Sequence, residues 1–538
     1  MNRFVRSGVL LGVLLMGVSS AAIGASAQEQ ASPAFSWTGI HFGGGGGFGV
    51  ANHNVGFSLY EYLDLPYEPG TPTQDIIAFG GTFDFGGTGD FWTAAAGLDV
   101  RLGRFVFGAG GDYTRSEMTT ELNLTGEVCY EDDGSGDPPD NCDIAVVDDE
   151  VFANLIVHSG EAWAVWGRAG FLATPRTLFY GLLGRSWNSI TVEANLEALG
   201  VPDGFVEFAS EPTWVPGIMF GAGVETYIFE HVTLGLEYRG TRYSLGEGVE
   251  IEGEEFGLDV FDNYMNHTIR GTLALRFGPD GGTVTDESFG PDRTDWTGIY
   301  LGAGGGYGFS NHYASAFGYD YTLGGLFAVG GVDVFSIGGG VDVGGQGGLL
   351  TVGGGFDVQL GNHAVLGAFG DFTHSGIGPM ITGFWTVCED VDTDPVGSCD
   401  VAGDPFPEID GAFEAGIRMG NQWTIGGRFG VLTGPRTLVY GMAGYTKAEL
   451  VAWFEAFPGD AEPFGDETIF ERSAVSFGAG VESLLTNNLS VFLEYRGTLW
   501  NMDDEIMTSP DSGFGFGLSN YVQTVRAGIN WRPGGNAN

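Results

Sequence analysis

Apolar and polar residues alternate along several stretches of the chain with a period of two, which is the period of a β-strand. From 269 to 277, the odd positions hold only apolar residues and glycine, whereas the even positions include Arg270 and Arg276. The stretches 232–239, 489–496 and 525–532 alternate in the same way. This pattern predicts an all-β protein whose antiparallel strands have one apolar and one polar face.

Two arrangements fit such strands: a soluble sandwich buries the apolar face, whereas a transmembrane barrel turns it toward lipid. The barrel is favoured because the strands, at about ten residues, are long enough to cross the hydrocarbon at a tilt. The polar faces also carry full charges, such as Glu237 and Arg239, which would be costly in a soluble core. Aromatic residues near strand ends are expected to form an interfacial girdle: Trp37, Tyr238, Phe277, Trp296, Tyr495 and Trp531.

The chain contains the same unit twice. Trp37-Thr38-Gly39-Ile40 recurs 259 residues later at 296–299, and Glu237-Tyr238-Arg239-Gly240-Thr241 recurs 257 residues later at 494–498. A nearly constant offset across many such landmarks indicates a tandem duplication.

Each copy is predicted to contain eight strands. In the first copy they lie near 37–50, 91–102, 104–116, 161–172, 176–187, 215–228, 231–243 and 266–277, and the second copy has the same eight between about 296 and 532. Tight turns alternate with long connections near 54–90, 117–160, 188–214 and 244–265, which is the outer-membrane pattern of short periplasmic turns and long outer loops.

The N-terminus predicts export. Arg3 and Arg6 precede a short apolar stretch at 9–18, and Ala25-Ser26-Ala27 is typical of a cleavage site, so residues 1–27 are interpreted as a Sec-type signal peptide cleaved near Ala27. The apolar stretch is short for an uncleaved spanning anchor.

The remaining chain is divided into a first barrel at 28–278, a linker at 279–294 and a second barrel at 295–538. The preferred fold is two tandem eight-stranded, up-and-down antiparallel barrels that span the membrane. The alternative is one fused sixteen-stranded barrel with an aqueous channel. Separate barrels are preferred because each copy has its own first and last strand signatures and the linker is longer than a periplasmic turn.

Composition adds a strong negative charge. The sequence has 69 Asp and Glu residues against 21 Lys and Arg, a formal net charge of −48. Such a chain repels phosphate backbones, so nucleic acid is excluded as a partner. The charge is expected to lie mostly in the outward loops. Glycine is also abundant, with 96 residues, and the runs at Gly43–Gly47 and Gly304–Gly306 suit a tightly curved barrel wall.

In these features each copy resembles the small eight-stranded outer-membrane β-barrel family of alphaproteobacterial surface proteins, part of the OmpA-like barrel superfamily and often labelled "porin family". The resemblance rests on the Trp-Thr-Gly starts, the Gly-rich first strands, the Phe-Gly-Ala-Gly-Val-Glu and Glu-Tyr-Arg blocks, and the pairs Gly111-Asp112 with Gly370-Asp371 and Gly167-Arg168 with Gly427-Arg428. It implies an outer-membrane location, contact with lipid and lipopolysaccharide, and insertion by the barrel-assembly machinery. Family members usually carry one barrel and end on an aromatic residue, whereas this chain carries two copies and continues past Trp531 to Asn538.

A cluster of charged side chains is expected inside each barrel. Its predicted members are Asp112, Arg168, Glu237, Arg239 and Arg270 in the first copy, and Asp371, Arg428, Glu494, Arg496 and Arg526 in the second. One interpretation is a gate or a narrow polar path. The preferred one is a set of salt bridges that plugs the lumen, because eight strands leave an interior just filled by side chains.

The four cysteines predict disulfides, because an even cysteine count in an exported protein suggests them. Four cysteines allow three pairings, and the spacing favours two local bridges in the outer loops, Cys129–Cys142 and Cys388–Cys399. Zinc is the disfavoured alternative, since the spacings are not those of zinc ligands. Asp390, Asp392 and Asp394 imitate the start of a calcium loop, but Pro395 stands where the loop needs glycine. The sequence therefore predicts no cofactor beyond weakly bound divalent cations.

These observations favour a structural and surface-interaction role with an unidentified extracellular partner. A porin-type channel for small solutes is the alternative that goes with a fused barrel. An outer-membrane hydrolase is disfavoured, because the sequence has neither a G-x-S-x-G nor an HExxH motif. His53 and His312 occupy equivalent positions and are expected at the barrel rims, so the protein is not predicted to be an enzyme.

Overall fold

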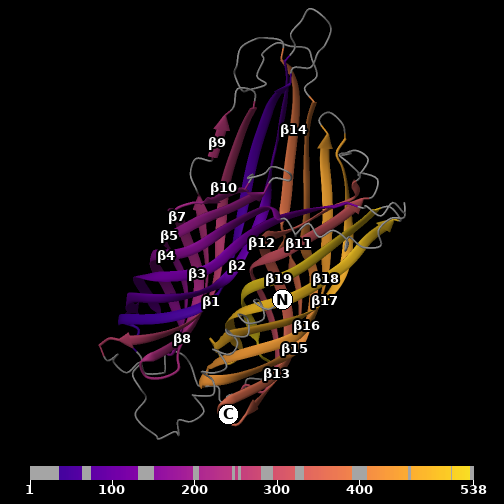
Figure 1. The fold of residues 1–538 in the computed structure, drawn as a ribbon. Coiled ribbons are helices and arrows are strands. Elements are labelled where there is room, and N and C mark those ends of the chain that lie inside the picture. The colour runs from indigo at the N-terminus through magenta and orange to yellow at the C-terminus, as the bar shows by residue number, and fades with distance from the viewer. Residues whose placement is uncertain are drawn as a thin grey trace, which may run out of the picture.

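The fold is an antiparallel β-barrel architecture, and the nineteen strands found in the described part of the chain belong to one connected sheet (Figure 1). The computed structural model describes residues 36–63, 74–130, 151–197, 205–244, 249–252, 256–279, 295–320, 332–390, 409–458, 462–509 and 512–533. In these ranges, the structure contains no helix that is long and apolar enough to span a membrane.

Strands β1–β10 come from the first half of the chain and β11–β19 from the second. The first ten are β1 (Gly39–Leu63), β2 (Gln74–Leu102), β3 (Phe105–Tyr130), β4 (Val151–Thr174), β5 (Thr177–Glu197), β6 (Phe205–Ala209), β7 (Thr213–Tyr227), β8 (Val232–Ser244), β9 (Val249–Glu252) and β10 (Phe256–Phe277). The others are β11 (Gly298–Asp320), β12 (Val332–Leu360), β13 (Ala364–Ser375), β14 (Met380–Asp390), β15 (Ile409–Gly434), β16 (Thr437–Pro458), β17 (Phe464–Leu484), β18 (Leu489–Ser509) and β19 (Ser512–Trp531).

Hydrogen-bonded ladders run in a closed circuit within each half. In the first half, the order β1-β2-β3-β4-β5-β7-β8-β10 returns to β1 through the ladder that pairs Ile40 with Phe277. In the second half, β11-β12-β13-β15-β16-β17-β18-β19 returns to β11, where Leu301 pairs with Trp531. The first and last strand of each half are thus neighbours.

Three further ladders connect the two circuits at the ends of the strands that lie away from the short turns. Strand β2 pairs with β14 over 74–83, β3 pairs with β12 over 122–130, and β2 meets β12 at the single pair Phe85–Val343. The sheet therefore continues from one half to the other, as a fused barrel's would, so the two separate eight-stranded barrels remain a prediction. Near the short turns the ladders run within each half, where β1 pairs with β10 and β11 pairs with β19. A single sixteen-stranded barrel would join the two halves there as well.

The predicted strands are present, but most are longer than expected. Strand β2 covers 29 residues, whereas the pattern indicated 91–102, because its ladder with β1 continues out to the pair Leu63–Asp75. Much of each predicted outer loop is thus strand. In the second half one strand is interrupted after Ser375, and its continuation β14 begins at Met380. Pro379 has no N–H to give to a ladder, which accounts for the break.

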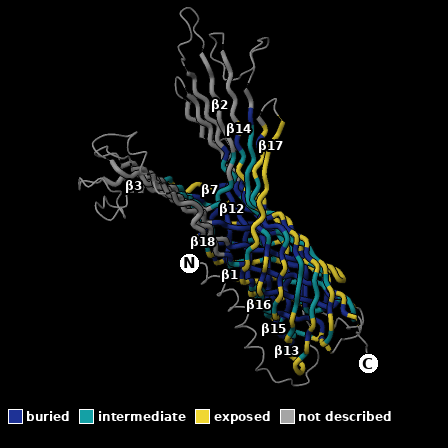
Figure 2. The backbone as a smooth tube through the Cα atoms, turned by 90° about the vertical axis from the view of Figure 1, so that its right-hand side faces the viewer, coloured by how far each residue is buried: buried dark blue, intermediate teal, exposed yellow. Residues whose placement is uncertain are grey.

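The burial of side chains along the strands is inverted relative to a soluble protein. On β2, Trp92 and Leu98 are about half exposed, at 50% and 53%, whereas Thr93 and Asp99, the residues that follow them, are 5% and 0% exposed. The same alternation follows β3, β4, β15 and β16, and Figure 2 shows buried and exposed residues alternating along the strands near the labels β15 and β16. Apolar side chains cover the outside, and polar side chains fill the inside.

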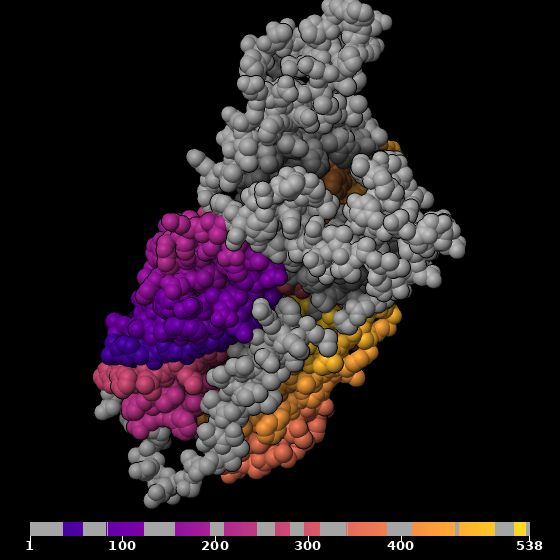
Figure 3. Space-filling model, viewed as in Figure 1, coloured from indigo at the N-terminus to yellow at the C-terminus, as the bar shows by residue number. Residues whose placement is uncertain are grey.

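One part of the apolar outer surface is buried, because the two halves pack against each other. A single cluster contains Leu236 and Tyr238 from the first half and Leu493 and Tyr495 from the second. Figure 3 shows the two halves as adjoining masses. The predicted place of Tyr238 and Tyr495 in a lipid-facing girdle is therefore wrong, whereas Phe277 and Trp531 are exposed by about half.

Candidate functional site

The interior of the first half contains a cluster of four charged side chains near the short turns, called here the first turn-side cluster. Its members are Asp99 on β2, Arg168 on β4, Glu225 on β7 and Arg276 on β10, all buried. Arg276 donates to Asp99 at 2.8 Å and to Glu225 at 2.8 Å. Arg168 bridges the same two carboxylates, with its Nη1 atom 3.2 Å from Glu225 and its Nη2 atom against Asp99. Each carboxylate thus accepts from two arginines.

Trp37 closes this cluster from the turn side. Its ring lies 4.5 Å from the Arg276 guanidinium carbon, and its indole Nε1 donates to the carbonyl oxygen of Pro175 at 2.9 Å. Such a placement combines a cation–π contact with a satisfied indole N–H. Trp37 and Trp296 are 1% and 0% exposed, so their predicted place in the girdle is also wrong.

The second half repeats this arrangement as the second turn-side cluster, with Asp357, Arg428, Glu482 and Arg532. Arg532 donates to Asp357 at 2.9 Å and to Glu482 at 3.0 Å. Arg428 donates to Glu482 at 3.0 Å and to Asp357 at 2.5 Å. The Arg532 guanidinium carbon lies 4.8 Å from the ring of Trp296.

A second layer of charges lies farther from the turns in the first half, and is called here the first central cluster. Arg239 donates to Asp112 at 2.6 Å and to Glu237 at 2.5 Å. Arg270 lies 3.5 Å from Asp112, and Tyr180 donates to Glu237 at 2.7 Å.

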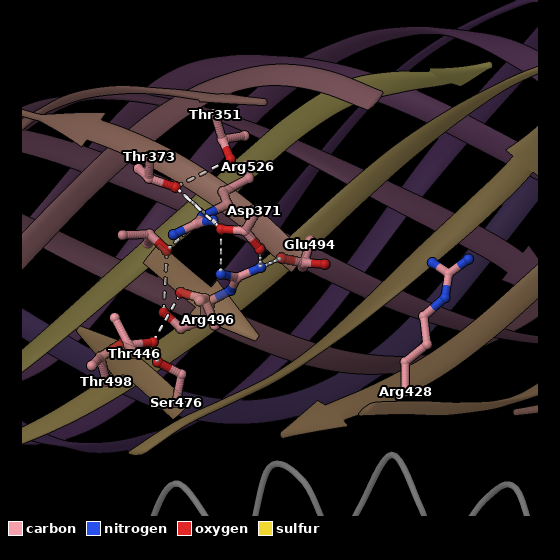
Figure 4. A network of polar contacts seen from close by, with 12 residues as sticks. Thr351, Asp371, Thr373, Arg428, Thr446, Ser476, Glu494, Arg496, Thr498 and Arg526 are labelled. Carbon is pink, nitrogen blue, oxygen red and sulfur yellow. Dashed lines mark hydrogen bonds and ion pairs between the residues drawn. The ribbon is translucent and has the colours of Figure 1, made fainter. Parts of the chain in front are cut away.

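The second central cluster consists of Asp371, Glu494, Arg496 and Arg526 (Figure 4). Arg496 donates to Asp371 through both terminal nitrogens, at 3.0 and 2.8 Å, and also donates to Glu494 at 3.0 Å. Arg526 adds a contact of 3.4 Å to Asp371. Bidentate arginine–carboxylate pairs of this kind are among the stronger hydrogen-bonded ion pairs.

A chain of hydroxyl groups lines the same interior beside the second central cluster. Thr446 lies 2.9 Å from Thr424 and 2.6 Å from Ser476, and Ser476 lies 2.8 Å from Thr498 (Figure 4). These hydroxyls satisfy one another across β15, β16, β17 and β18, so the polar interior continues beyond the charges.

The charges of the interior clusters balance within each half. The turn-side and central clusters of each half together contain four carboxylates and four arginines, and all eight side chains are at most 11% exposed. Arginine stays charged in proteins, and buried charges are tolerated when they are paired and hydrogen-bonded. Each interior is therefore a neutral, cross-linked plug rather than a surface of one sign that would attract an ion.

The two interiors fill the space around the central cluster with different residues. In the first half, Trp166 on β4 lies opposite Gly110 on β3, and its indole donates to Asp112 at 2.7 Å. In the second half the sizes are reversed, with Gly426 on β15 opposite Phe369 on β13. An aromatic ring therefore occupies each interior, although it comes from a different strand.

Small cavities remain beside both central clusters. The cavity of the second half is about 70 Å³ and reaches Asp371, Arg496 and Arg526, and that of the first half is about 60 Å³ and reaches Glu237 and Arg239. At about 15 Å³ for each water on this measure, each has room for roughly four or five water molecules. This space suits trapped water and is small for a passing solute.

The structure places all ten predicted lumen residues in these four clusters. Pattern analysis missed six equally engaged partners: Asp99, Glu225, Arg276, Asp357, Glu482 and Arg532. Signals for them were present. Glu225 and Glu482 end the repeated Phe-Gly-Ala-Gly-Val-Glu blocks, and Arg276 and Arg532 have the polar parity of the alternating stretches 269–277 and 525–532.

The predicted disulfides and cation ligands lie largely outside the described residues. Cys142, Cys399, Asp392 and Asp394 are not described, and for Cys129 on β3 and for Cys388 and Asp390 on β14 the backbone alone is described. In the described part of the chain, no group of three or more His, Cys, Asp or Glu side chains is arranged to hold a metal ion.

The two equivalent histidines are not at a rim, so that expectation is wrong. His53 is 4% exposed within β1 and stacks on Tyr264 with ring centroids 4.9 Å apart. His312 is 1% exposed within β11, and its Nε2 atom lies 2.9 Å from Ser310 Oγ. Both lie inside strands because β1 continues past its predicted end near 50 to Leu63, and β11 continues to Asp320.

Neither a family model nor a curated protein sequence matches the chain, so its resemblance to the small outer-membrane barrels stays a prediction. Among solved structures, a Pseudomonas aeruginosa FadL homologue is 13% identical, with 96% of this chain and 94% of that chain covered and a TM-score of 0.22. Ail, the attachment invasion locus protein of Yersinia pestis, is 13% identical, with 42% and 98% covered and a TM-score of 0.17. The outer membrane protease OmpT from Escherichia coli is 9% identical, with 94% and 99% covered and a TM-score of 0.17. Because these TM-scores lie below 0.5, none of the three likenesses bears on what this chain does.

Proposed function

We propose that the protein is an integral outer-membrane protein of two plugged eight-stranded barrels, with a structural and surface-interaction role rather than transport or catalysis. The first barrel would be 28–278 and the second 295–538, joined by the linker 279–294 after removal of residues 1–27. The observation that carries the proposal is the inverted burial of the strands, with exposed apolar residues outside and balanced charges inside. In lipid a strand must be paired on both edges, and the closed circuits of ladders supply that pairing.

The plugged interiors favour a structural role over a channel. Arginines that pair with carboxylates from several strands tie each wall together across the lumen, as Arg276 does from β10 to β2 and β7. The carboxylates and arginines of the turn-side and central clusters are all paired with one another. These clusters therefore supply no separate nucleophile and base, and the role proposed is not enzymatic. The surface for a partner would come from the strand ends beyond the circuits, where β2, β3, β12 and β14 project.

Planar-bilayer conductance tests the proposal. Flotation of the same preparation with lipid vesicles first establishes that the protein is inserted. Two plugged barrels predict an electrically silent membrane with, at most, brief small openings. Large, stable conductance steps from the inserted protein would overturn the proposal in favour of a porin-type channel.

A further inference from the structure

The two halves contact each other through equivalent residues. Offsets of 256 to 260 relate the repeated sequence landmarks, so each residue of one half has a counterpart in the other. The hydroxyl oxygens of Thr177 and Thr437, which are counterparts 260 apart, lie 2.9 Å from each other near the short turns. Phe85 and Val343, counterparts 258 apart, pair with each other at the far side. A residue that meets its own counterpart lies on a two-fold axis.

The two ladders that join the halves are also counterparts. In one, β2 pairs with β14, beginning with Phe83 opposite Ile381. In the other, β12 pairs with β3, ending with Val341 opposite Leu122. Val341 is the counterpart of Phe83, and Ile381 is the counterpart of Leu122, at offsets of 258 and 259. The same strand exchange therefore occurs twice, once in each direction.

Two asparagines make reciprocal contacts where the strands exchange. Asn52 on β1 donates to the carbonyl oxygen of Gly345 on β12 at 3.1 Å. A Cβ on Gly344 would lie 2.4 Å from Asn52 Oδ1, and a Cβ on Gly86 would lie 2.1 Å from Asn311 Oδ1. Asn52 and Asn311 are counterparts, as are Gly86 and Gly344, so the need for glycine at each position comes from the other half.

The apolar cluster between the halves has the same symmetry. It contains Leu236 with Leu493, Tyr238 with Tyr495, Val224 with Val481, Phe179 with Val439, Val50 with Phe309, and Ile269 with Val525. Each of these is a pair of counterparts. The same patch of each half is thus buried against the same patch of the other.

We infer that this interface is isologous: each half carries a self-complementary docking surface, and the partner that it fits is a second copy of that half. An interface whose residues contact their own counterparts is the signature of a two-fold dimer. The linker therefore joins two units that would associate without it, and the outer sheets are composite, since each contains strands from both halves.

The inference rests on the two eight-stranded barrels proposed above. It is tested in the full chain with a protease site placed in the linker. After cleavage in detergent, an affinity tag on the first half is expected to recover the second half in equal amount. Separation of the halves on cleavage would overturn the inference.

Matched glycine variants test the reciprocity. Gly86→Leu and Gly344→Leu are each expected to lower the recovery of the second half about tenfold, because overpacking at one site has an effect of that size. Gly348→Ala, at which a Cβ would meet nothing within 4 Å, is expected to change nothing. A loss in one glycine variant without a comparable loss in the other would contradict an isologous contact.

Self-complementarity is tested by cross-linking, which does not depend on the glycine variants being folded. A Thr177→Cys chain is cleaved at the linker, incubated so that halves exchange, and oxidised. A link between position 177 of two first halves, identified by mass spectrometry, is the expected result. The Thr177→Cys/Thr437→Cys chain is the control, because its two cysteines lie on different halves of one chain. If a link forms in this control and none joins two first halves, the surface is not self-complementary. The bilayer experiment is independent, because a conducting channel would refute the plugged barrels and leave the cross-linking result readable.

Discussion

The two halves place an aromatic ring and a glycine at swapped positions: Trp166 corresponds to Gly426, and Gly110 corresponds to Phe369. This swap gives a quantitative test of how the interiors are filled. In the first half, a Cβ on Gly110 would lie 2.6 Å from the Trp166 ring, and in the second half one on Gly426 would lie 2.8 Å from the Phe369 ring. Backbone oxygens lie at least as close, with Ala96 O 2.5 Å and Ala443 O 2.3 Å from these Cβ positions, so the ring and the backbone together require glycine on the neighbouring strand. The perturbation is to give the first half the pair of residues that the second half uses.

The magnitudes follow from what the indole contacts. Removing the Trp166 ring from a packed interior is expected to cost about 4 kcal/mol of unfolding free energy. Asp112 also loses the indole donor at 2.7 Å, and a hydrogen bond to a charged group is worth about 2 kcal/mol. Trp166→Gly should therefore lower stability by about 6 kcal/mol. Gly110→Phe alone should lower it by about 2 kcal/mol through overpacking.

The double variant Trp166→Gly/Gly110→Phe is expected to recover the ring but not the indole hydrogen bond. Its loss should therefore be about 2 kcal/mol, so the two substitutions compensate by about 6 kcal/mol relative to their sum. Urea unfolding in lipid vesicles measures these free energies through the fluorescence of the remaining tryptophans. The reciprocal pair Gly426→Trp/Phe369→Gly in the second half is the matched control. A double variant as unstable as the sum of its singles would refute the packing described here.

Three other sets of substitutions test separate features by the same unfolding measurement. Arg276→Met leaves Asp99 and Glu225 each with one arginine fewer and should lower the unfolding free energy by about 3 to 5 kcal/mol. Its counterpart Arg532→Met should have the same effect, and a loss below about 1 kcal/mol would contradict the role given to the turn-side clusters. Leu183→Arg puts a charge on an outward position that is 66% exposed and should cost about 2 to 4 kcal/mol in vesicles, whereas no loss would argue against a lipid-facing surface. Gly103→Ala should cost about 1 kcal/mol because this turn residue has a φ of +66°, and Gly348→Ala, which has ordinary backbone geometry, is its control; equal effects would show that the turn does not require glycine.

Alternation and repetition predicted much of this architecture, because both are local properties of the sequence. The two parities of 269–277 anticipated that Arg270 faces inward and that Leu275 and Phe277 are exposed. The repeated Glu-Tyr-Arg block drew attention to Glu237 and Arg239, which the structure brings to Asp112. These residues lie on strands in which apolar and polar residues alternate without interruption, so the side of the strand that each one faces follows from its position in the alternation.

The rest depends on contacts that no single stretch of sequence encodes. Tyr238 has the outward parity of a lipid-facing residue, yet it is buried, because the other half covers this part of the surface. Asp99 was not predicted as a lumen residue, because its arginines come from β4 and β10, far along the chain. The ladders between β2 and β14 and between β3 and β12 lie in segments that were predicted as loops, because glycine and acidic residues there hide the alternation.

Lipid quenching of individual tryptophans tests the inverted burial most directly. Single-tryptophan variants that retain Trp92, Trp163 or Trp423, each at least 50% exposed, are compared with variants that retain Trp37, Trp166 or Trp296, each at most 7% exposed. In vesicles of brominated lipid, the first three are predicted to be strongly quenched and the last three to keep their fluorescence. Quenching of the interior tryptophans with the outward ones unaffected would contradict a barrel whose apolar face meets lipid.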